Sequence, residues 1–250
     1  EVISLADGLD ELLIGSFGVQ VVAKPGEAYG ALKGTDYTYN EEGQKIIGAD
    51  GQPVWSDADQ IIGNGNPDWL AGVRNTFSYK NLALSVFVDI RSGGEMYSLD
   101  QRYGQATGVL ASSDYINDLG NPVRNSLANG GGFIYEGVLA DGTPNTKRLD
   151  ASAFGNTGYR ALPLSEFVYD ASFVKLREVS LAYNFPKDFV TKLRMDNLSL
   201  SLVGSNLWII HKNIPDADPE TGFGSGNIQG ISSGSLPTTR NFALNLKLQF

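Results

Sequence analysis

Three acidic side chains have the spacing of a cation-binding loop. Asp216, Asp218 and Glu220 stand at alternate positions of the string PDADPETG, as the first oxygen ligands of a calcium loop do. Thr221 occupies the position where such a loop needs glycine, and Asn227 occupies the position of its bidentate glutamate. The flanking prolines suit a rigid turn instead. These residues are therefore only a weak candidate metal site, and we expect neither a bound metal nor a cofactor.

Other residue types that carry bond chemistry are scarce. His211 is the single histidine and the chain has no cysteine, which excludes thiol catalysis and thiolate-bound metals. No nucleophile elbow accompanies His211, as a serine hydrolase of that type would require. The string GFGSGN at 222–227 lacks the lysine and the following helix of a phosphate-binding loop. We therefore predict that the protein is not an enzyme.

Composition favours a β-rich chain without nucleic-acid partners. The 250 residues include 30 glycines and carry a net charge of −9. A surface that binds phosphate backbones needs clustered Lys and Arg, so no nucleic-acid partner is expected. Frequent Gly, Asn, Ser and Asp indicate many turns between short elements. No run of about 18 apolar residues occurs, so the sequence predicts no membrane-spanning helix.

The elements that must position any site are strands with two-residue alternation. Lys80 and Asn81 alone separate two of them, which predicts a tight hairpin. Within a third predicted strand, at 173–185, the apolar residues switch from one face to the other, which predicts a β-bulge near Arg177–Glu178. The expected strands span 69–79, 82–91, 173–185, 197–206 and 241–250, with weaker candidates at 12–22 and 29–39.

The same alternation fits two surroundings. In a soluble sandwich the apolar face meets a protein core, whereas in a membrane barrel it meets lipid and the polar face meets a wet lumen. Strand lengths suit a tilted crossing of the bilayer. Long segments at 92–170 and 211–238 fall on one side of the strands, and short links fall on the other. Aromatic residues at strand ends fit interfacial girdles: Trp69, Tyr79, Phe185, Trp208, Phe242 and Phe250.

Several longer strings carry a family resemblance. KPGEAYGALKGTDYTYNEEGQKIIGADGQPVW, then GNGNPDWLAGVRNTFSYKNLALSVFVDIRSGGEMY, resembles the C-terminal half of SusC/RagA-type TonB-dependent outer-membrane transporters. The resemblance continues, in the order of that family, through DASFVKLREVSLAYNFP, LSLSLVGSNLW, DPETGFGSGNIQG and LPTTRNFALNLKLQF. The resemblance covers nearly the whole chain.

The resemblance implies a fold, a location and a function. It implies an all-β, antiparallel transmembrane β-barrel in the bacterial outer membrane, with residues 1–250 as its C-terminal portion and with long extracellular loops. The expected strands are too few to close such a barrel, so the isolated chain would have two unpaired edges. The resemblance also implies import of glycan or peptide oligomers with a SusD-like surface lipoprotein, outer-membrane lipid and TonB as partners. The plug domain through which TonB acts is not recognisable here. The alternative is a soluble all-β carbohydrate-binding or adhesion module.

Candidate site residues follow from this interpretation. Aromatic side chains of the 92–170 segment would stack on substrate, namely Tyr97, Tyr103, Tyr115 and Tyr135. Asp89 and Arg91 would face the lumen and line the path. By resemblance, a last strand that ends in an aromatic residue is the signal read by the barrel-assembly machinery, here Phe242, Leu244, Leu246, Leu248 and Phe250.

Overall fold

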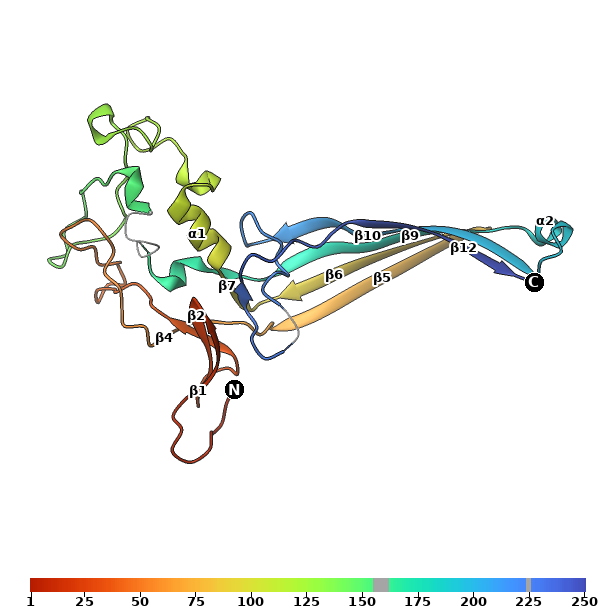
Figure 1. The fold of residues 1–250 in the computed structure, drawn as a ribbon, viewed down its shortest axis with the longest axis horizontal. Coiled ribbons are helices and arrows are strands. Elements are labelled where there is room, and N and C mark those ends of the chain that lie inside the picture. Colours follow the sequence, from red (N-terminus) through yellow and green to blue (C-terminus); the bar gives the residue numbers. More distant parts are fainter. Residues whose placement is uncertain (155–161, 224–225) are drawn as a thin grey trace. The chain divides into compact units, whose positions relative to one another are not determined.

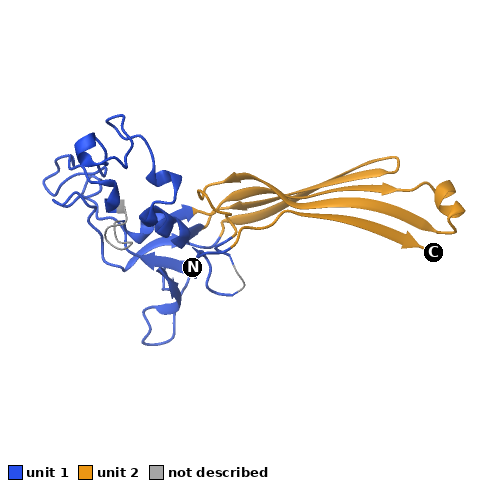
Figure 2. Cartoon of the chain, turned by 45° about the horizontal axis from the view of Figure 1, so that its top comes forward, with its two compact units in different colours: residues 1–66, 95–169, 221–235 blue, residues 67–94, 170–220, 236–250 orange. Residues whose placement is uncertain are grey.

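The computed structural model (Figure 1) describes residues 1–154, 162–223 and 226–250. Part of the expected 92–170 loop, including Tyr159, and two residues of GFGSGN, Gly224 and Ser225, lie outside the described residues. The chain forms two compact units, coloured separately in Figure 2. Unit 1 comprises 1–66, 95–169 and 221–235, and unit 2 comprises 67–94, 170–220 and 236–250.

Unit 2 is built on a five-stranded antiparallel sheet with the order β12-β10-β9-β6-β5. A two-residue turn joins β5 to β6, as expected for the tight hairpin. A short helix, α2, joins β9 to β10 and follows Pro186, whose fixed φ suits the start of a helix. The elements are β5 Trp69–Tyr79, β6 Leu82–Ser92, β9 Phe173–Asn184, α2 Lys187–Lys192, β10 Asn197–Lys212 and β12 Asn241–Gln249.

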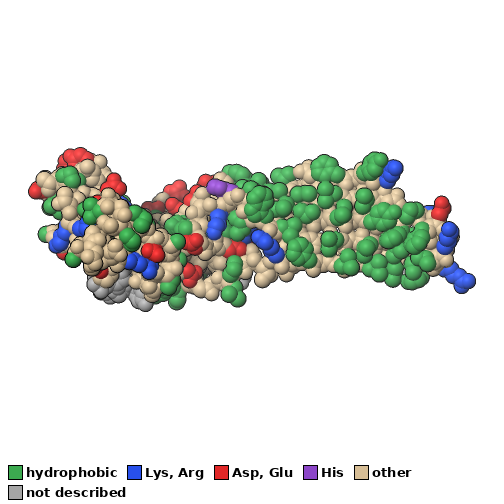
Figure 3. Space-filling view, turned by 90° about the horizontal axis from the view of Figure 1, so that it is seen from above, with side chains coloured by type: hydrophobic (Ala, Val, Ile, Leu, Met, Phe, Trp, Pro, Cys, Tyr) green, Lys and Arg blue, Asp and Glu red, His purple; other side chains and the backbone are tan. Residues whose placement is uncertain are grey.

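One face of this sheet is apolar across all five strands. Cross-strand pairing aligns the apolar residues in rows, and two such rows are Tyr79–Leu82–Tyr183–Leu200–Leu246 and Phe77–Leu84–Leu181–Leu202–Leu244. These side chains remain open to the surroundings: Phe242 and Leu244 are 71% and 70% exposed. Figure 3 shows the resulting apolar surface. A continuous exposed face of this kind marks contact with lipid or with another protein.

The opposite face changes character along the strands. Near the β5–β6 turn its rows contain small and neutral polar residues, such as Ser78–Ala83–Ala182–Ser201–Asn245. Toward the other end the rows become charged, with Arg74 and Glu178 in one row and Asp89 and Lys175 in the next. This gradient places the charged side chains of the sheet close to the long segment between β10 and β12.

The predicted bulge is confirmed. Phe87 of β6 pairs with Glu178, but the next residue, Val88, pairs with Leu176, so Arg177 is the extra residue. The bulge explains why the apolar phase of β9 reverses at this point. A matching irregularity in β10 contains Asn206, whose φ is +53°.

Unit 1 holds most of the buried apolar core. A four-stranded sheet, β1-β2-β3-β4, packs with α1 around Val19, Val21, Leu32 and Tyr97. Gly18 has φ +83°, and a Cβ there would lie 2.7 Å from the Tyr97 ring, so glycine is required on both counts. The elements are β1 Leu12–Phe17, β2 Val19–Ala23, β3 Ala31–Gly34, β4 Gln60–Asn64, β7 Glu95–Ser98, α1 Leu99–Thr107, β8 Val168–Asp170 and β11 Ile231–Ser232.

The differences from the expected elements have local causes. The 12–22 candidate is two strands, because Gly18 turns the chain between them. β10 continues to Lys212, beyond the predicted end, because its irregularity interrupts the alternation without ending the pairing. The described residues of 95–169 belong to unit 1 and include α1, whereas 92–170 was expected to be a loop. Within the described ranges, neither α1 nor α2 is long and apolar enough to cross a membrane.

Candidate functional site

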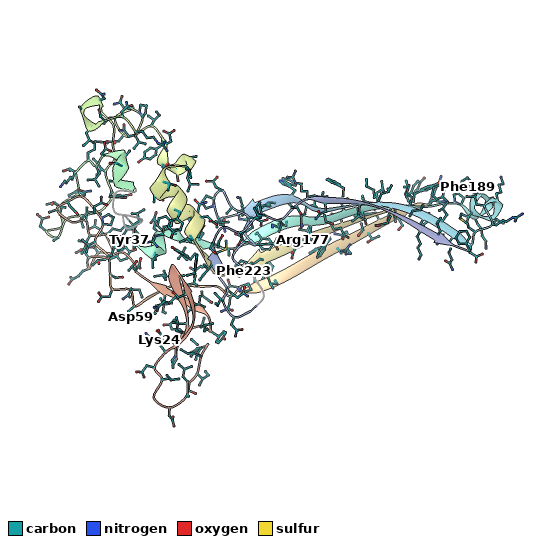
Figure 4. The ribbon with its side chains drawn as sticks, in the orientation of Figure 1. Lys24, Tyr37, Asp59, Arg177, Phe189 and Phe223 are labelled. Atoms are coloured by element: carbon teal, nitrogen blue, oxygen red, sulfur yellow. The ribbon has the colours of Figure 1, made fainter. Side chains whose placement is uncertain are left out.

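The polar face of the five-stranded sheet carries a buried cluster of charges. Lys175 donates hydrogen bonds of 2.5 Å to Asp218 and to Glu220. Arg177, labelled in Figure 4, binds Asp89 and Glu220. The side chains of Lys175 and Asp218 are each only 3% exposed. Such a cluster is stable only when every charge has a partner, and these five residues supply one another with partners.

The cluster ties two strands to the segment between β10 and β12. Lys175 and Arg177 belong to β9 and Asp89 to β6, whereas Asp218 and Glu220 lie in the intervening segment. The backbone N–H and hydroxyl of Thr238 also donate to Asp218, and Arg177 donates to the amide oxygen of Asn206. The bulge brings Arg177 within reach of both acids. The cluster therefore holds this segment on the polar face.

The pKa of Asp218 makes this attachment sensitive to acid. Burial opposes ionisation, but hydrogen bonds from Lys175 and Thr238 hold the pKa at about 2, below the usual 3.8. The stabilisation is therefore complete above pH ~4 and is lost as the pH falls toward ~2. The difference corresponds to about 2 kcal/mol.

We therefore expect the unfolding free energies of wild type and Asp218→Asn to converge as the pH is lowered through this window. Urea unfolding of the full-length protein in detergent at several pH values measures both. A gap that stays constant with pH would contradict this assignment.

The weak candidate metal site takes up a different role. Asp218 and Glu220 accept hydrogen bonds from Lys175 and Arg177. Asp216, at φ +50°, is part of the turn that leads to them. Among the described residues, no group of three His, Cys, Asp or Glu is placed to hold a metal ion. Two of the three alternating carboxylates, Asp218 and Glu220, thus form ion pairs within the chain.

A second polar site is a tyrosine-lined pocket of about 650 Å³ in unit 1. Tyr37 and Tyr39 come from the segment after β3, and Tyr135 comes from the segment after α1. The rings of Tyr37 and Tyr39 meet edge to face at 6.3 Å, and Tyr135 packs edge to face on Phe133. Further lining includes Lys45, Gln44, Gln105, Glu136, Leu162 and Glu166. The volume and the mixed lining are typical of small-molecule sites.

The polar groups of this pocket are fixed in position. Tyr37 donates a 2.7 Å hydrogen bond to Glu166, and the Lys45 ammonium lies 3.6 Å above the Tyr37 ring. Burial and the Glu166 carboxylate raise the pKa values of both Tyr37 and Tyr135, so both phenols stay protonated. Among the described residues, the buried Tyr135 hydroxyl has no hydrogen-bond partner. Such a donor is free to bind a ligand oxygen if the pocket relaxes around it.

The four predicted substrate tyrosines fall into different environments. Tyr135 lines the pocket, and Tyr103 and Tyr115 are each 42% exposed. Tyr97 is fully buried, because its ring packs against Gly18 in the core and its hydroxyl accepts a hydrogen bond from Arg102. Tyr97 therefore has a structural role, which corrects the expectation that it contacts substrate.

The remaining sequence candidates are placed as follows. Asp89 and Arg91 lie on the polar face of β6, as expected, but Asp89 is paired with Arg177 and Arg91 is buried. His211 is exposed on β10, opposite Val174. The candidate assembly signal forms β12 at an edge of the sheet, and its residues are Phe242, Leu244, Leu246 and Leu248, followed by Phe250.

Of the residues that line the pocket, the sequence predicted only Tyr135 as a site residue. Tyr37, Tyr39 and Lys45 belong to the string TDYTYNEEGQK, which supported the family resemblance and part of a weak strand at 29–39 but no site. The alternating tyrosines were a usable signal, because they share one face of an extended segment. Nothing in the local sequence around Glu166 predicts its contact with Tyr37, 129 residues away.

Comparisons with known proteins identify the class of protein. The chain is 26% identical to TonB-dependent receptor P3 and 32% identical to TonB-dependent receptor P26, both of Formosa agariphila. The matches cover 92% and 85% of this chain but 23% and 19% of those receptors. The chain thus spans about a fifth of the length of the curated relatives that it matches. No family model matches it.

Solved structures show the same fold. The RagAB peptide importer in its closed-closed state superposes with a TM-score of 0.60 at 16% identity, over 98% of this chain and 25% of that chain. Its open-open state gives a TM-score of 0.57. The exposed apolar face and charged inner face of unit 2 are those of a barrel wall. The chain is therefore homologous to TonB-dependent receptors over most of its length, and it has the fold of part of a SusC/RagA-type outer-membrane barrel.

Proposed function

We propose that this chain supplies the C-terminal strands and extracellular segments of a TonB-dependent importer of glycan or peptide oligomers. The observation that carries the proposal is the unbroken apolar surface over five paired strands, backed by a polar face that ends in fixed charges. The relatives are TonB-dependent receptors, and a structure of the same fold is a peptide importer. A SusD-like lipoprotein would close over the substrate, and TonB would act through a plug in another part of the protein.

Uptake by living cells tests the importer. A strain that lacks the full-length gene should lose uptake of fluorescently labelled oligomers, and a strain without TonB activity should lose it equally. A panel of neutral oligosaccharides and short peptides separates the two substrate classes. Uptake of every oligomer at the wild-type rate in both strains would overturn the proposal.

Solubility separates the importer from the soluble carbohydrate-binding module. The apolar side chains of unit 2 are exposed in rows, so the isolated chain should aggregate without detergent or its remaining strands. A monodisperse, monomeric preparation of these 250 residues in detergent-free buffer would favour the soluble module.

Within this proposal, the tyrosine-lined pocket is the place where unit 1 contacts substrate. Tyr39→Ala removes a 45% exposed ring from the lining, whereas Tyr29→Ala removes a 47% exposed ring elsewhere in unit 1. Loss of one stacking surface weakens binding by about 1 kcal/mol, or about fivefold in Kd. Calorimetry with a neutral oligosaccharide and with an uncharged peptide measures both variants. Equal effects of the two substitutions would remove the pocket from the proposal.

A further inference from the structure

The end of unit 2 that carries α2 is basic, although the whole chain is acidic. Lys80 lies in the β5–β6 turn, Lys187 and Lys192 lie in α2, and Arg194 follows α2. The acids on these links are Asp188 and Asp196. Among the described residues of unit 2, ion pairs involve Arg74, Lys175 and Arg177, and none uses these four cations. Figure 3 shows Lys and Arg side chains at this end.

An aromatic series extends the apolar face of the sheet onto α2. Tyr183 stands in one of the apolar rows, and its ring meets Phe185 edge to face at 5.0 Å. Phe185 in turn stacks on Phe189 of α2, with ring centroids 5.4 Å apart. Phe189, labelled in Figure 4, is 46% exposed. The surface that meets lipid along the strands therefore continues beyond their ends.

Helical spacing puts a cation beside this aromatic series. Lys192 and Leu193 follow Phe189 by three and four residues, so both share its face. Leu193 and Arg194 are both exposed, and Arg194 has a positive φ of +58°. Apolar rings next to long basic side chains are the arrangement of a helix at the membrane interface, where cations reach the headgroup phosphates.

We propose that Lys192 and Arg194, together with Phe189 and Leu193, bind the headgroup and upper acyl chain of an anionic phosphoglycerolipid. Charge complementarity favours an anion, because the local cations outnumber the local acids. The exposed Phe189 and Leu193 favour a lipid over a soluble phosphate, since a free anion would leave them without a partner. The site thus selects which lipid borders the barrel wall at this end. It depends on the outer-membrane location but not on which oligomer is imported.

Lipid capture by the full-length protein tests the site. The protein is reconstituted in nanodiscs of phosphatidylethanolamine with a minor fraction of phosphatidylglycerol, and retained lipid is counted by native mass spectrometry. Phosphatidylglycerol should be enriched on the wild type, and Lys192→Gln/Arg194→Gln should reduce its retention about tenfold. The matched control, Lys24→Gln/Lys147→Gln, removes the same charge from unit 1 and should leave retention unchanged.

Further measurements separate a lipid site from other anion binding. Phe189→Ser keeps the cations and should also reduce phosphatidylglycerol retention, whereas high salt should reduce it on the wild type. Heat-modifiable migration in SDS gels verifies that each variant is folded. Equal retention by wild type and the double variant would overturn the proposal. So would displacement of the lipid by inorganic phosphate, or an equal loss in the unit 1 control.

Discussion

Lys175→Met should lower the free energy of unfolding of the full-length protein by about 3–5 kcal/mol, the cost of breaking a buried ion pair by removing one partner. Lys175 and Asp218 are both buried, and Asp218 takes its side-chain charge compensation from Lys175. Methionine fills a similar volume but leaves the carboxylate without its cation. Urea unfolding in detergent, followed by tryptophan fluorescence, measures the loss.

Two further variants decide whether the charge itself causes this effect. Lys175→Met combined with Asp218→Asn should recover much of the loss, because no unpaired carboxylate then remains buried. Arg74→Gln removes the cation of an exposed pair with Glu178 on the same face, so it should cost at most ~1 kcal/mol. A Lys175→Met protein as stable as Arg74→Gln would show that the cluster contributes little.

Leu244→Arg should destabilise the membrane-inserted protein by about 2–4 kcal/mol, the range for a cation on the lipid face near the bilayer midplane. Leu244 lies near the middle of β12 and is 70% exposed on the apolar face. Its row also contains Phe77, Leu84, Leu181 and Leu202. Urea titration in lipid vesicles and the amount of protein recovered in outer-membrane fractions measure the effect.

The neighbouring residue provides the matched control. Asn245 directly follows Leu244 in β12 but lies on the polar face, opposite Ser201. Asn245→Arg should therefore insert almost as well as the wild type, although both variants add one arginine to β12. If the two variants insert equally, or if Asn245→Arg is the worse one, the faces of the sheet have been assigned the wrong way round.

The strands of unit 2 could be predicted from the sequence, because the apolar face of their sheet puts an apolar residue at every second position of each strand. The hairpin at Lys80–Asn81 and the bulge at Arg177 followed from the same period, and the structure confirms both. α2 was not predicted, because six residues after Pro186 give too short a pattern to separate a helix from a turn. The core of unit 1 was not predicted either, since its strands are only two to six residues long and its contacts are distant in sequence.

The candidate sites show the same limit. Asp89 was correctly placed on the polar face, because strand alternation is a local property. Its pairing with Arg177, and the meeting of Lys175 with Asp218, depend on how a loop folds back over the sheet, which no local period records. Tyr97 was misread for a related reason: an aromatic residue within a glycine-rich stretch looks exposed until the partner that covers it, here Gly18, is known.

The extra residue at Arg177 also bears on how chain length can vary during evolution. Because Glu178 and Leu176 already pair with adjacent residues of β6, deletion of Arg177 would leave both halves of β9 facing the correct way. A single deletion at Leu181 would instead turn part of the strand over and bring polar residues to the lipid. For strand register alone, a one-residue deletion is therefore tolerated better at this bulge than elsewhere in β9, but losing Arg177 itself would also remove the cation that Asp89 and Glu220 share.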